Sequence, residues 1–213
     1  MRKKIKVARK HIKIGDVLYY GGEFWRVLDI EDEKALCCLD CSFKYINGPV
    51  ANGMWRFDGE DSDYLHSDLV KYIGNFENLI RQTEEENEKK DNLNGNRKEI
   101  EEKKAIILSG TWRMCDFWYS YKDADNKEVG FWSKMALISS THVERYYKQI
   151  VKATDRLVRK GKNYCYFYVG DKGKAQLCIF NYKSKDQILY YNVTNKKACY
   201  PVFPIIVLNI ENK

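Results

Sequence analysis

The sequence has little proline and lacks any long apolar run. Only 3 of its 213 residues are proline and 14% are aromatic, which excludes collagen-like, low-complexity and largely disordered classes. No apolar stretch approaches the roughly 20 residues of a membrane-spanning helix. The lysine-rich start also lacks the apolar segment of a signal peptide. We therefore expect a soluble, cytoplasmic protein with no membrane partner.

A disulfide framework is also missing. The 7 cysteines are an odd number, and Cys37 and Cys38 are adjacent, so we expect reduced thiols. Cys38 and Cys41 have the CxxC spacing of zinc ligands, but the second pair of a four-ligand site does not follow. Free cysteine in apolar runs behaves as a small buried hydrophobe. We predict no metal and no cofactor.

No catalytic motif is present either. The histidines His11, His66 and His142 form no HExxH group, and no Gly-x-Ser-x-Gly turn marks a serine nucleophile. We expect each histidine to be a surface or capping residue. The acidic stretch at 58–63 is dense enough for an acid/base pair, but a solvated loop before a helix N-terminus also favours acids. We predict a non-enzymatic protein and keep an acid/base enzyme, with Asp58, Glu60 and Asp61 in its site, as a third hypothesis.

Apolar periodicity predicts an α+β fold, with a mixed, mainly antiparallel sheet and two principal helices. Residues 65–80 and 141–158 repeat apolar side chains every three or four positions, as helices with one buried face do. Thr141 and Glu144 form a capping-box pattern at the second start. The β-rich runs lie at 16–20, 24–30, 35–39, 105–108, 112–121, 129–137, 164–169, 175–180, 188–193 and 200–208. The first three predict a meander, because paired glycines separate the first two.

The chain reads as a basic arm at 1–13 followed by a single α+β domain at 14–213. Pro49 and three glycines predict a loop at 47–59. Residues 81–104 are mostly charged, and we find no face there that a core would bury. They predict a charged insertion, either a mobile loop or an exposed helical hairpin. A long insertion costs little entropy and does not divide the domain.

Five short segments together resemble a known family. They read FWRVLD at 24–29, ALCCL at 35–39, SDLVKYI at 67–73, LISSTHVE at 137–144 and FPIIVL at 203–208. They are similar to segments of uncharacterised domains that occur in gut bacteria and their phages. The resemblance implies a C-type-lectin-like fold. It also implies a binding or assembly role in a bacterium or phage, virion-associated if a phage encodes the chain.

Aromatic side chains are the most unusual feature of the sequence. The chain has sixteen Tyr and five Trp, and many of them fall in the β-rich runs. Exposed rings anchor protein interfaces or stack on sugars and bases, whereas buried rings supply core volume. Our first hypothesis is a binding or assembly module that acts through protein–protein contact, with another protein or by self-association. The candidate partner-binding residues are Trp118, Tyr119, Tyr121, Tyr190, Tyr191 and Tyr200.

The alternative is a nucleic-acid-associated protein. The net charge is +7, and residues 1–13 contain basic side chains but no acid. A phosphate backbone would release counterions on binding such an arm, whereas a lysine-rich surface that serves solubility is the other interpretation. No recognised nucleic-acid motif accompanies it. The candidate residues are Arg2, Lys3, Lys4, Lys6, Arg9, Lys10, Arg156, Arg159 and Lys160.

The nucleic-acid hypothesis predicts salt-sensitive binding that depends on the arm. Affinity for a DNA or RNA duplex should fall steeply between low and moderate salt, because each phosphate contact releases counterions. Deletion of residues 1–13 should abolish this binding. Fluorescence anisotropy with a labelled duplex measures both effects. Binding that survives the deletion, or that ignores salt, contradicts the hypothesis.

Overall fold

The structure is a computed structural model of the whole chain. It describes residues 11–40, 54–56, 68–90, 97–108, 110, 113–122, 125–158, 164–169, 175–180, 188–192, 199–201 and 203–211. Helices and mostly antiparallel strands share this part of the chain, which confirms the α+β prediction.

The predicted meander is present and forms one side of the central sheet. It consists of β1 (Val17–Tyr20), β2 (Glu23–Glu31) and β3 (Lys34–Leu39), paired antiparallel. Gly21 and Gly22 make the first turn with φ of +60° and +82°, values that side chains disfavour. The register of β2 against β3 shifts between Val27 and Asp29, as at a β-bulge. Such a shift changes where the following side chains point.

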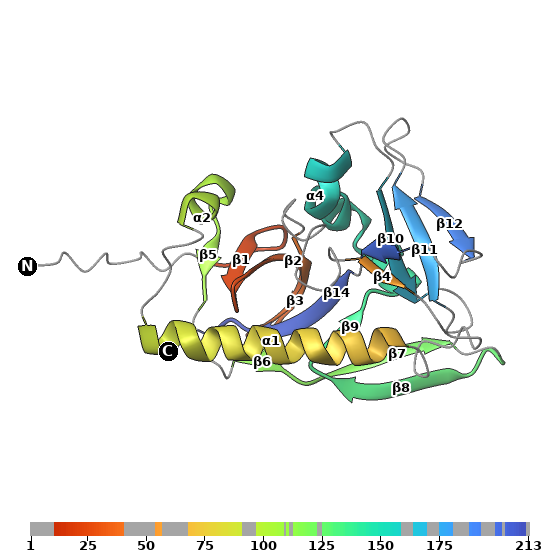
Figure 1. Cartoon of the computed structure of the whole chain (residues 1–213), viewed down its shortest axis with the longest axis horizontal. Helices are drawn as coiled ribbons and strands as arrows, with labels where there is room; N and C mark the ends of the chain where they lie inside the picture. The colour runs from red at the N-terminus through yellow and green to blue at the C-terminus, as the bar shows by residue number, and fades with distance from the viewer. Residues whose placement is uncertain are drawn as a thin grey trace, which may run out of the picture.

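The C-terminal strand completes this sheet. β14 (Pro204–Asn209) pairs antiparallel with β3, β6 (Met114–Cys115) and β9 (Met135–Leu137). β5 (Ile106–Ile107) pairs parallel with β1 at the other edge, so the order is β5-β1-β2-β3-β14-β6. Nearly every β14 side chain is buried. A strand with apolar residues on both faces belongs at the centre of a sheet, and Figure 1 shows β14 in the middle of the molecule.

Three smaller sheets surround the central one. β10 (Tyr164–Val169), β11 (Ala175–Phe180) and β12 (Ile188–Asn192) form an antiparallel sheet. β7 (Phe117–Lys122) and β8 (Glu128–Ser133) form a two-stranded ribbon, at the bottom of Figure 1. β13 (Cys199–Pro201) pairs with β4 (Met54–Arg56). Because β4 lies inside the predicted loop at 47–59, that prediction is wrong for its three residues, which obtain a partner from the far end of the chain.

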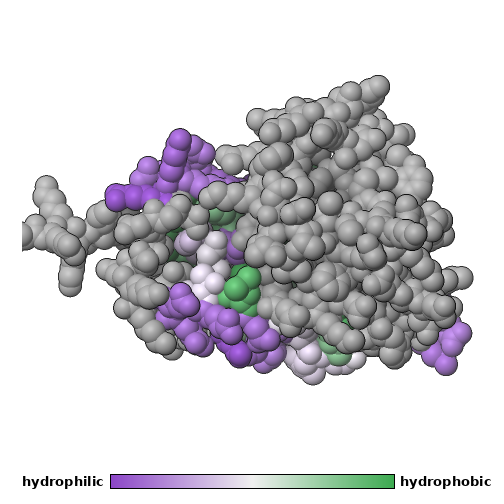
Figure 2. All heavy atoms as spheres, in the orientation of Figure 1, coloured by the Kyte–Doolittle hydropathy of each residue, from purple (hydrophilic) through white to green (hydrophobic). Residues whose placement is uncertain are grey.

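The first helix is longer than its apolar pattern predicts. α1 (Asp68–Lys90) runs ten residues past 80, and α2 (Arg97–Lys103) follows. Ile100 and Glu84 are buried, so the expectation that residues 81–104 have no buried face is wrong. Glu84 is buried because it accepts hydrogen bonds from the backbone N–H groups of Gly21 (2.8 Å) and Gly110 (3.2 Å). Most of the other described side chains of the segment are polar and exposed, and Figure 2 shows hydrophilic side chains over α2.

The second predicted helix is divided in two. α3 (Ser140–Arg145) and α4 (Tyr147–Val158) meet at Tyr146, which has φ −113° and ψ 24°. The N-cap is Ser139 rather than the predicted Thr141, because the Ser139 hydroxyl accepts from the backbone N–H of His142. None of the helices that the structure describes is both long enough and apolar enough to cross a membrane.

The core is formed by the central sheet, α1, β9 and the β7–β8 ribbon. Trp25 is fully buried, and its indole N–H donates to the Tyr20 carbonyl at 3.1 Å. Cys37 and Cys38 are buried free thiols, and Cys115 is a half-buried one. This confirms the expected reduced state for these three. The side chains of the other four cysteines lie outside the described residues.

The Gly21 turn yields a stability prediction. A Cβ at Gly21 would lie 2.4 Å from Cγ2 of Ile80 on α1, at φ +60°. Gly21→Ala should therefore lower the free energy of unfolding by about 2–4 kcal/mol. Gly74→Ala is the matched control, because a Cβ there meets nothing within 4 Å, and it should stabilise α1 by about 0.5–1 kcal/mol. Urea denaturation measures both, and an unchanged Gly21→Ala midpoint would contradict the packing.

Candidate functional site

The two faces of the β7–β8 ribbon differ sharply. Side chains alternate along a strand, and Tyr119 and Tyr121 point inward, 1% and 7% exposed. Trp118 and Trp132 lie opposite each other on the outer face, 55% and 68% exposed. This corrects the candidate set for Tyr119, whose ring belongs to the core. Tyr121 is also buried but lines a cavity beside the ribbon, and Trp118 remains exposed.

The indole of Trp118 is held in place by its neighbours. Its ring packs edge-to-face against Trp132, with centroids 5.8 Å apart. It also lies over Gly130, where a Cβ would fall 2.2 Å from Cζ2 of the indole. Gly130 is the diagonal neighbour of Trp118 on this face, since it pairs with Ser120. The missing side chain is therefore what allows Trp118 to lie across the ribbon.

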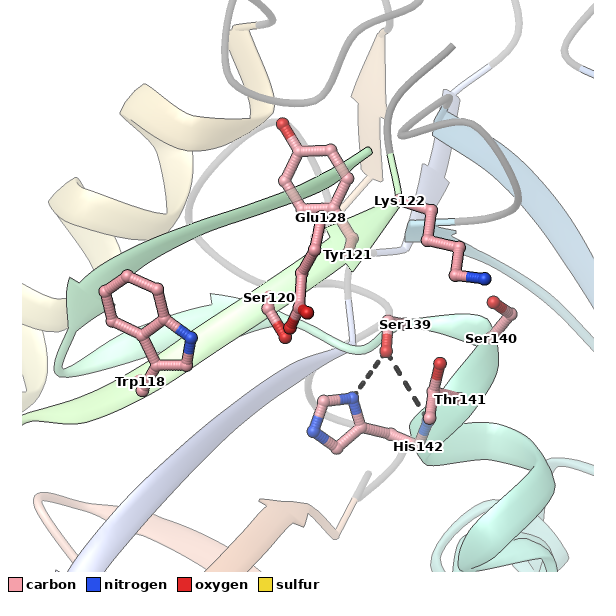
Figure 3. Close-up of a pocket in the computed structure, with 9 residues that line it drawn as sticks. All are labelled: Trp118, Ser120, Tyr121, Lys122, Glu128, Ser139, Ser140, Thr141 and His142. Atoms are coloured by element: carbon pink, nitrogen blue, oxygen red, sulfur yellow. Dashed lines mark hydrogen bonds between the residues drawn. The ribbon is translucent and has the colours of Figure 1, made fainter. Parts of the chain in front are cut away.

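Two cavities flank Trp118. One, of about 400 Å³, lies between the outer face of the ribbon and the start of α3. Figure 3 shows Trp118, Ser120, Lys122 and Glu128 on the ribbon side, facing Ser139 to His142. We name it the hydroxyl cavity, after Ser120, Ser139, Ser140 and Thr141. Its lining mixes these hydroxyls with aromatic rings and carries a cationic side chain, Lys122, and an anionic one, Glu128.

The other cavity, of about 510 Å³, is rich in carboxylates, and we name it the acidic groove. Its acidic residues are Asp29, Glu31, Asp32 and Asp116, and its basic residues are Lys34 and Arg145. Trp118 and Trp132 also line it, together with His142 and Tyr146. Because Trp118 and His142 line both cavities, they form the wall between them.

His142 is held in one orientation by the helix cap. Its Nδ1 lies 2.5 Å from Oγ of Ser139, and the same oxygen accepts the His142 backbone N–H at 3.4 Å. The tautomer of the ring sets which of Ser139 Oγ and Nδ1 donates in this contact. The imidazole stacks on Tyr119 with an interplanar angle of 3° and centroids 6.0 Å apart.

The environment of His142 disfavours its charged form. Burial lowers its pKa to about 4, and the nearby positive charge of Arg145 acts in the same direction. The imidazole is therefore neutral at pH 7 and adds no positive charge to either cavity. Ser139 is only 2% exposed and caps α3, so this pair is built as a helix cap. The expectation that His142 is a surface or capping residue misses its place in the cavity wall.

Asp29 differs from the other acids of the groove because it is already paired. Its Oδ2 accepts from the Tyr146 hydroxyl at 2.7 Å and from Arg145 at 3.4 Å, and its Oδ1 accepts from the Ile30 N–H at 2.9 Å. Burial raises the pKa of Tyr146 to about 12, and the hydrogen bond to Asp29 adds to this. Asp29 therefore links the β2 bulge to the end of α3 and to Tyr146, where α3 and α4 meet.

The three remaining acids are exposed. Glu31 and Asp32 lie at the β2–β3 turn, and Asp116 lies between β6 and β7. None of the three side chains forms a hydrogen bond or ion pair with another described side chain. Among the described residues, no group of three or more His, Cys, Asp or Glu side chains is arranged to hold a metal ion. These acids are therefore available to an external ligand.

The remaining predicted site residues lie on other elements or outside the described residues. Tyr190 and Tyr191 lie on β12 and Tyr200 on β13, away from the ribbon in Figure 1, and their side chains are not described. Arg156 lies in α4, its side chain also undescribed. Outside the described residues lie Arg2, Lys3, Lys4, Lys6, Arg9, Lys10, Asp58, Glu60, Asp61, Arg159 and Lys160. The nucleic-acid and acid/base hypotheses therefore stay predictions.

Sequence reasoning missed Trp132, Asp29, Asp116 and His142 as parts of one site. One signal was available, because Trp118 and Trp132 lie at equal distances in sequence on either side of Asp125, in the predicted turn. Strands joined by such a turn place these rings opposite each other. The other three residues lie on different elements, and no local pattern connects them.

The lowered pKa of His142 predicts a pH-dependent stability. Its folded pKa, about 4, lies below the ordinary 6.5, so the unfolded chain binds more protons between these values. The His142 contribution should be full above pH 6.5 and should decrease by about 2–3 kcal/mol as the pH falls to 4. Urea denaturation of the wild type and His142→Gln measures it as a difference. A difference independent of pH would contradict the assignment.

Comparison of the chain with protein-family models, with curated protein sequences and with solved structures gives no match. The C-type-lectin-like resemblance of its five segments therefore stays a prediction. What the chain does has to be argued from its own residues and geometry, and the feature that distinguishes this surface is the exposed Trp118–Trp132 pair beside the acidic groove.

Proposed function

We propose that the protein is a non-enzymatic binding module that engages another protein through the outer face of the β7–β8 ribbon and the acidic groove. The observation that carries the proposal is the Trp118–Trp132 pair, two large rings in contact and more than half exposed. Scattered apolar side chains on a surface are ordinary. Tryptophan, however, is the residue most enriched among the anchors of protein interfaces.

The way in which Trp118 is held also supports a binding role. Ordering a free side chain on association costs about 0.5–1.5 kcal/mol. Trp118 already lies against Trp132 and over Gly130, so most of that cost is met in the free protein. The proposal also explains Gly130. A side chain at this position would displace the Trp118 indole, and the ribbon itself does not need a glycine there.

The groups beside the pair suit contact better than chemistry. His142, the group in the cavity wall that is best suited to proton transfer, directs Nδ1 to Ser139 and has a pKa of about 4. A general base works best when its pKa lies near the operating pH. A neutral imidazole instead serves as a hydrogen-bonding group. The proposed assembly role in a bacterium or phage rests on the sequence resemblance alone.

The proposal predicts that partner capture depends on the two indoles. A nuclease-treated pull-down from the native lysate should lose its protein partner with the Trp118→Ser/Trp132→Ser double variant. Leu79→Ser is the matched control, because Leu79 is also exposed, at 43%, but lies on α1. Gly130→Ala should weaken capture while both indoles remain. The thermal midpoints should change little, because exposed side chains contribute little to folding.

Photo-crosslinking makes the same test direct. A photoreactive side chain in place of Ser120, on the outer face beside Trp118, should crosslink to the captured partner. The same group in place of Leu79 should not. Capture that ignores the Trp double variant, or crosslinks equally from both positions, would contradict a binding role for this surface.

A further inference from the structure

We infer that the segment bound at the acidic groove is a stretch of a partner protein that carries lysine or arginine side chains. This inference rests on the proposed function and names the chemistry of the partner. Two features carry it: an excess of negative charge in the groove, and the position of that charge beside two exposed indoles.

The groove is negative on a chain whose net charge is +7. Arg145 is already engaged with Asp29, which leaves Lys34 against Glu31, Asp32 and Asp116. All four of these side chains are exposed. The unpaired charge in the groove is therefore negative, and His142 does not offset it, because its imidazole is neutral at pH 7. Complementary charge selects a cationic partner and repels an acidic one.

The indoles favour the same ligand. A lysine ammonium or arginine guanidinium within about 6 Å of an indole is attracted by the ring, and tryptophan is the strongest partner for it. Trp118 and Trp132 line the same groove as the carboxylates. A cationic side chain with an apolar stem can therefore contact a ring along its length and a carboxylate at its head.

A nucleic acid, by contrast, fits this surface poorly. Its phosphates would face Glu31, Asp32 and Asp116, and among the described residues that line the groove Lys34 is the one basic side chain not paired with Asp29. The stacking capacity of the indoles alone would have to overcome that repulsion. The charge of the groove therefore favours a cationic ligand, whereas the ligand predicted for the basic arm at residues 1–13 is a nucleic acid.

The test uses the full chain and a fluorescein-labelled peptide of alternating lysine and glycine. The matched probe is the same peptide with every lysine acetylated, which removes the charge and keeps most of the stem. In fluorescence anisotropy the lysine peptide should bind at least about tenfold more tightly, and its affinity should fall as salt rises. A glutamate–glycine peptide should not bind. Equal affinities for the lysine and acetylated peptides would overturn the inference.

Variants locate the contact. The double variant Asp32→Asn/Asp116→Asn should lower the affinity for the lysine peptide by about threefold to tenfold, since exposed charge pairs are individually weak. Asparagine suits position 32, where φ is +52°. Trp118→Ser/Trp132→Ser should weaken it by a similar factor. Glu85→Gln is the control, because Glu85 is exposed on α1. Equal losses in the control and the groove variants would overturn the inference.

Two further measurements exclude other occupants. N-acetyl-arginine amide should bind far more weakly than the peptide, and equal affinity would make the ligand a single small cation. In sedimentation velocity, the groove variants should not change the oligomeric state of the protein. Self-association that these variants abolish would make a second copy of this chain the occupant and overturn the inference. If the pull-down depends on the indoles but the lysine peptide does not bind, the proposed function stands and the inference fails.

Discussion

The buried carboxylate of Glu84 joins three distant parts of the chain, and the position of the long helix depends on it. Glu84 is 3% exposed on α1 and accepts backbone N–H groups from the β1–β2 turn and from Gly110. Removing a carboxylate from water is costly unless hydrogen bonds and opposite charge compensate. Burial lowers the pKa of Arg113, and the charges of Tyr20, Glu211 and Glu84 act in the opposite direction, so this guanidinium interacts electrostatically with the Glu84 carboxylate. Arg113 also donates to the carbonyls of Asn209 and Glu211 after β14.

The same constraint reaches the candidate site. α1 contacts β9, and β9 leads directly into Ser139 and α3, which hold His142 in the cavity wall. A second buried carboxylate, that of Asp40, ties α2 to the sheet through Lys103 and Arg26, each 2.5 Å away. Both acids bind groups that are distant in sequence. Glu84 is 63 positions from Gly21, and Asp40 is 63 positions from Lys103. The sequence pattern predicted the strands and the apolar helix faces. It assigns charged residues to the surface, however, so it did not predict the buried contacts within residues 81–104.

The two strands of the ribbon were predictable from the sequence. Which face of the ribbon is buried was not, because it depends on where the core lies. Alternation separates Trp118 from Tyr119, but the strand alone does not say which of them faces inward. The core packs against Tyr119 and Tyr121, and this decides it. Asp29 illustrates a different limit. The β2 bulge shifts the register by one residue at Asp29, and the sequence pattern of a strand contains no sign of this shift. The cap at Ser139 rather than Thr141 depends on which hydroxyl accepts the His142 N–H, and both residues are of a type that caps helices.

Net charge is a poor guide to what this surface binds. The total of +7 suggests a polyanion, but binding responds to the charges within about a Debye length, which is about 8 Å at physiological salt. Within the acidic groove that local balance is negative. The neutral state of His142 matters for the same reason. A cation at this point, in the wall shared by both cavities, would offset one of the unpaired acids and would place positive charge at the N-terminus of α3, where the helix dipole opposes it. Burial against Tyr119 and the bond to Ser139 hold the ring where it stays neutral. The packing that orients His142 therefore also preserves the charge of the groove.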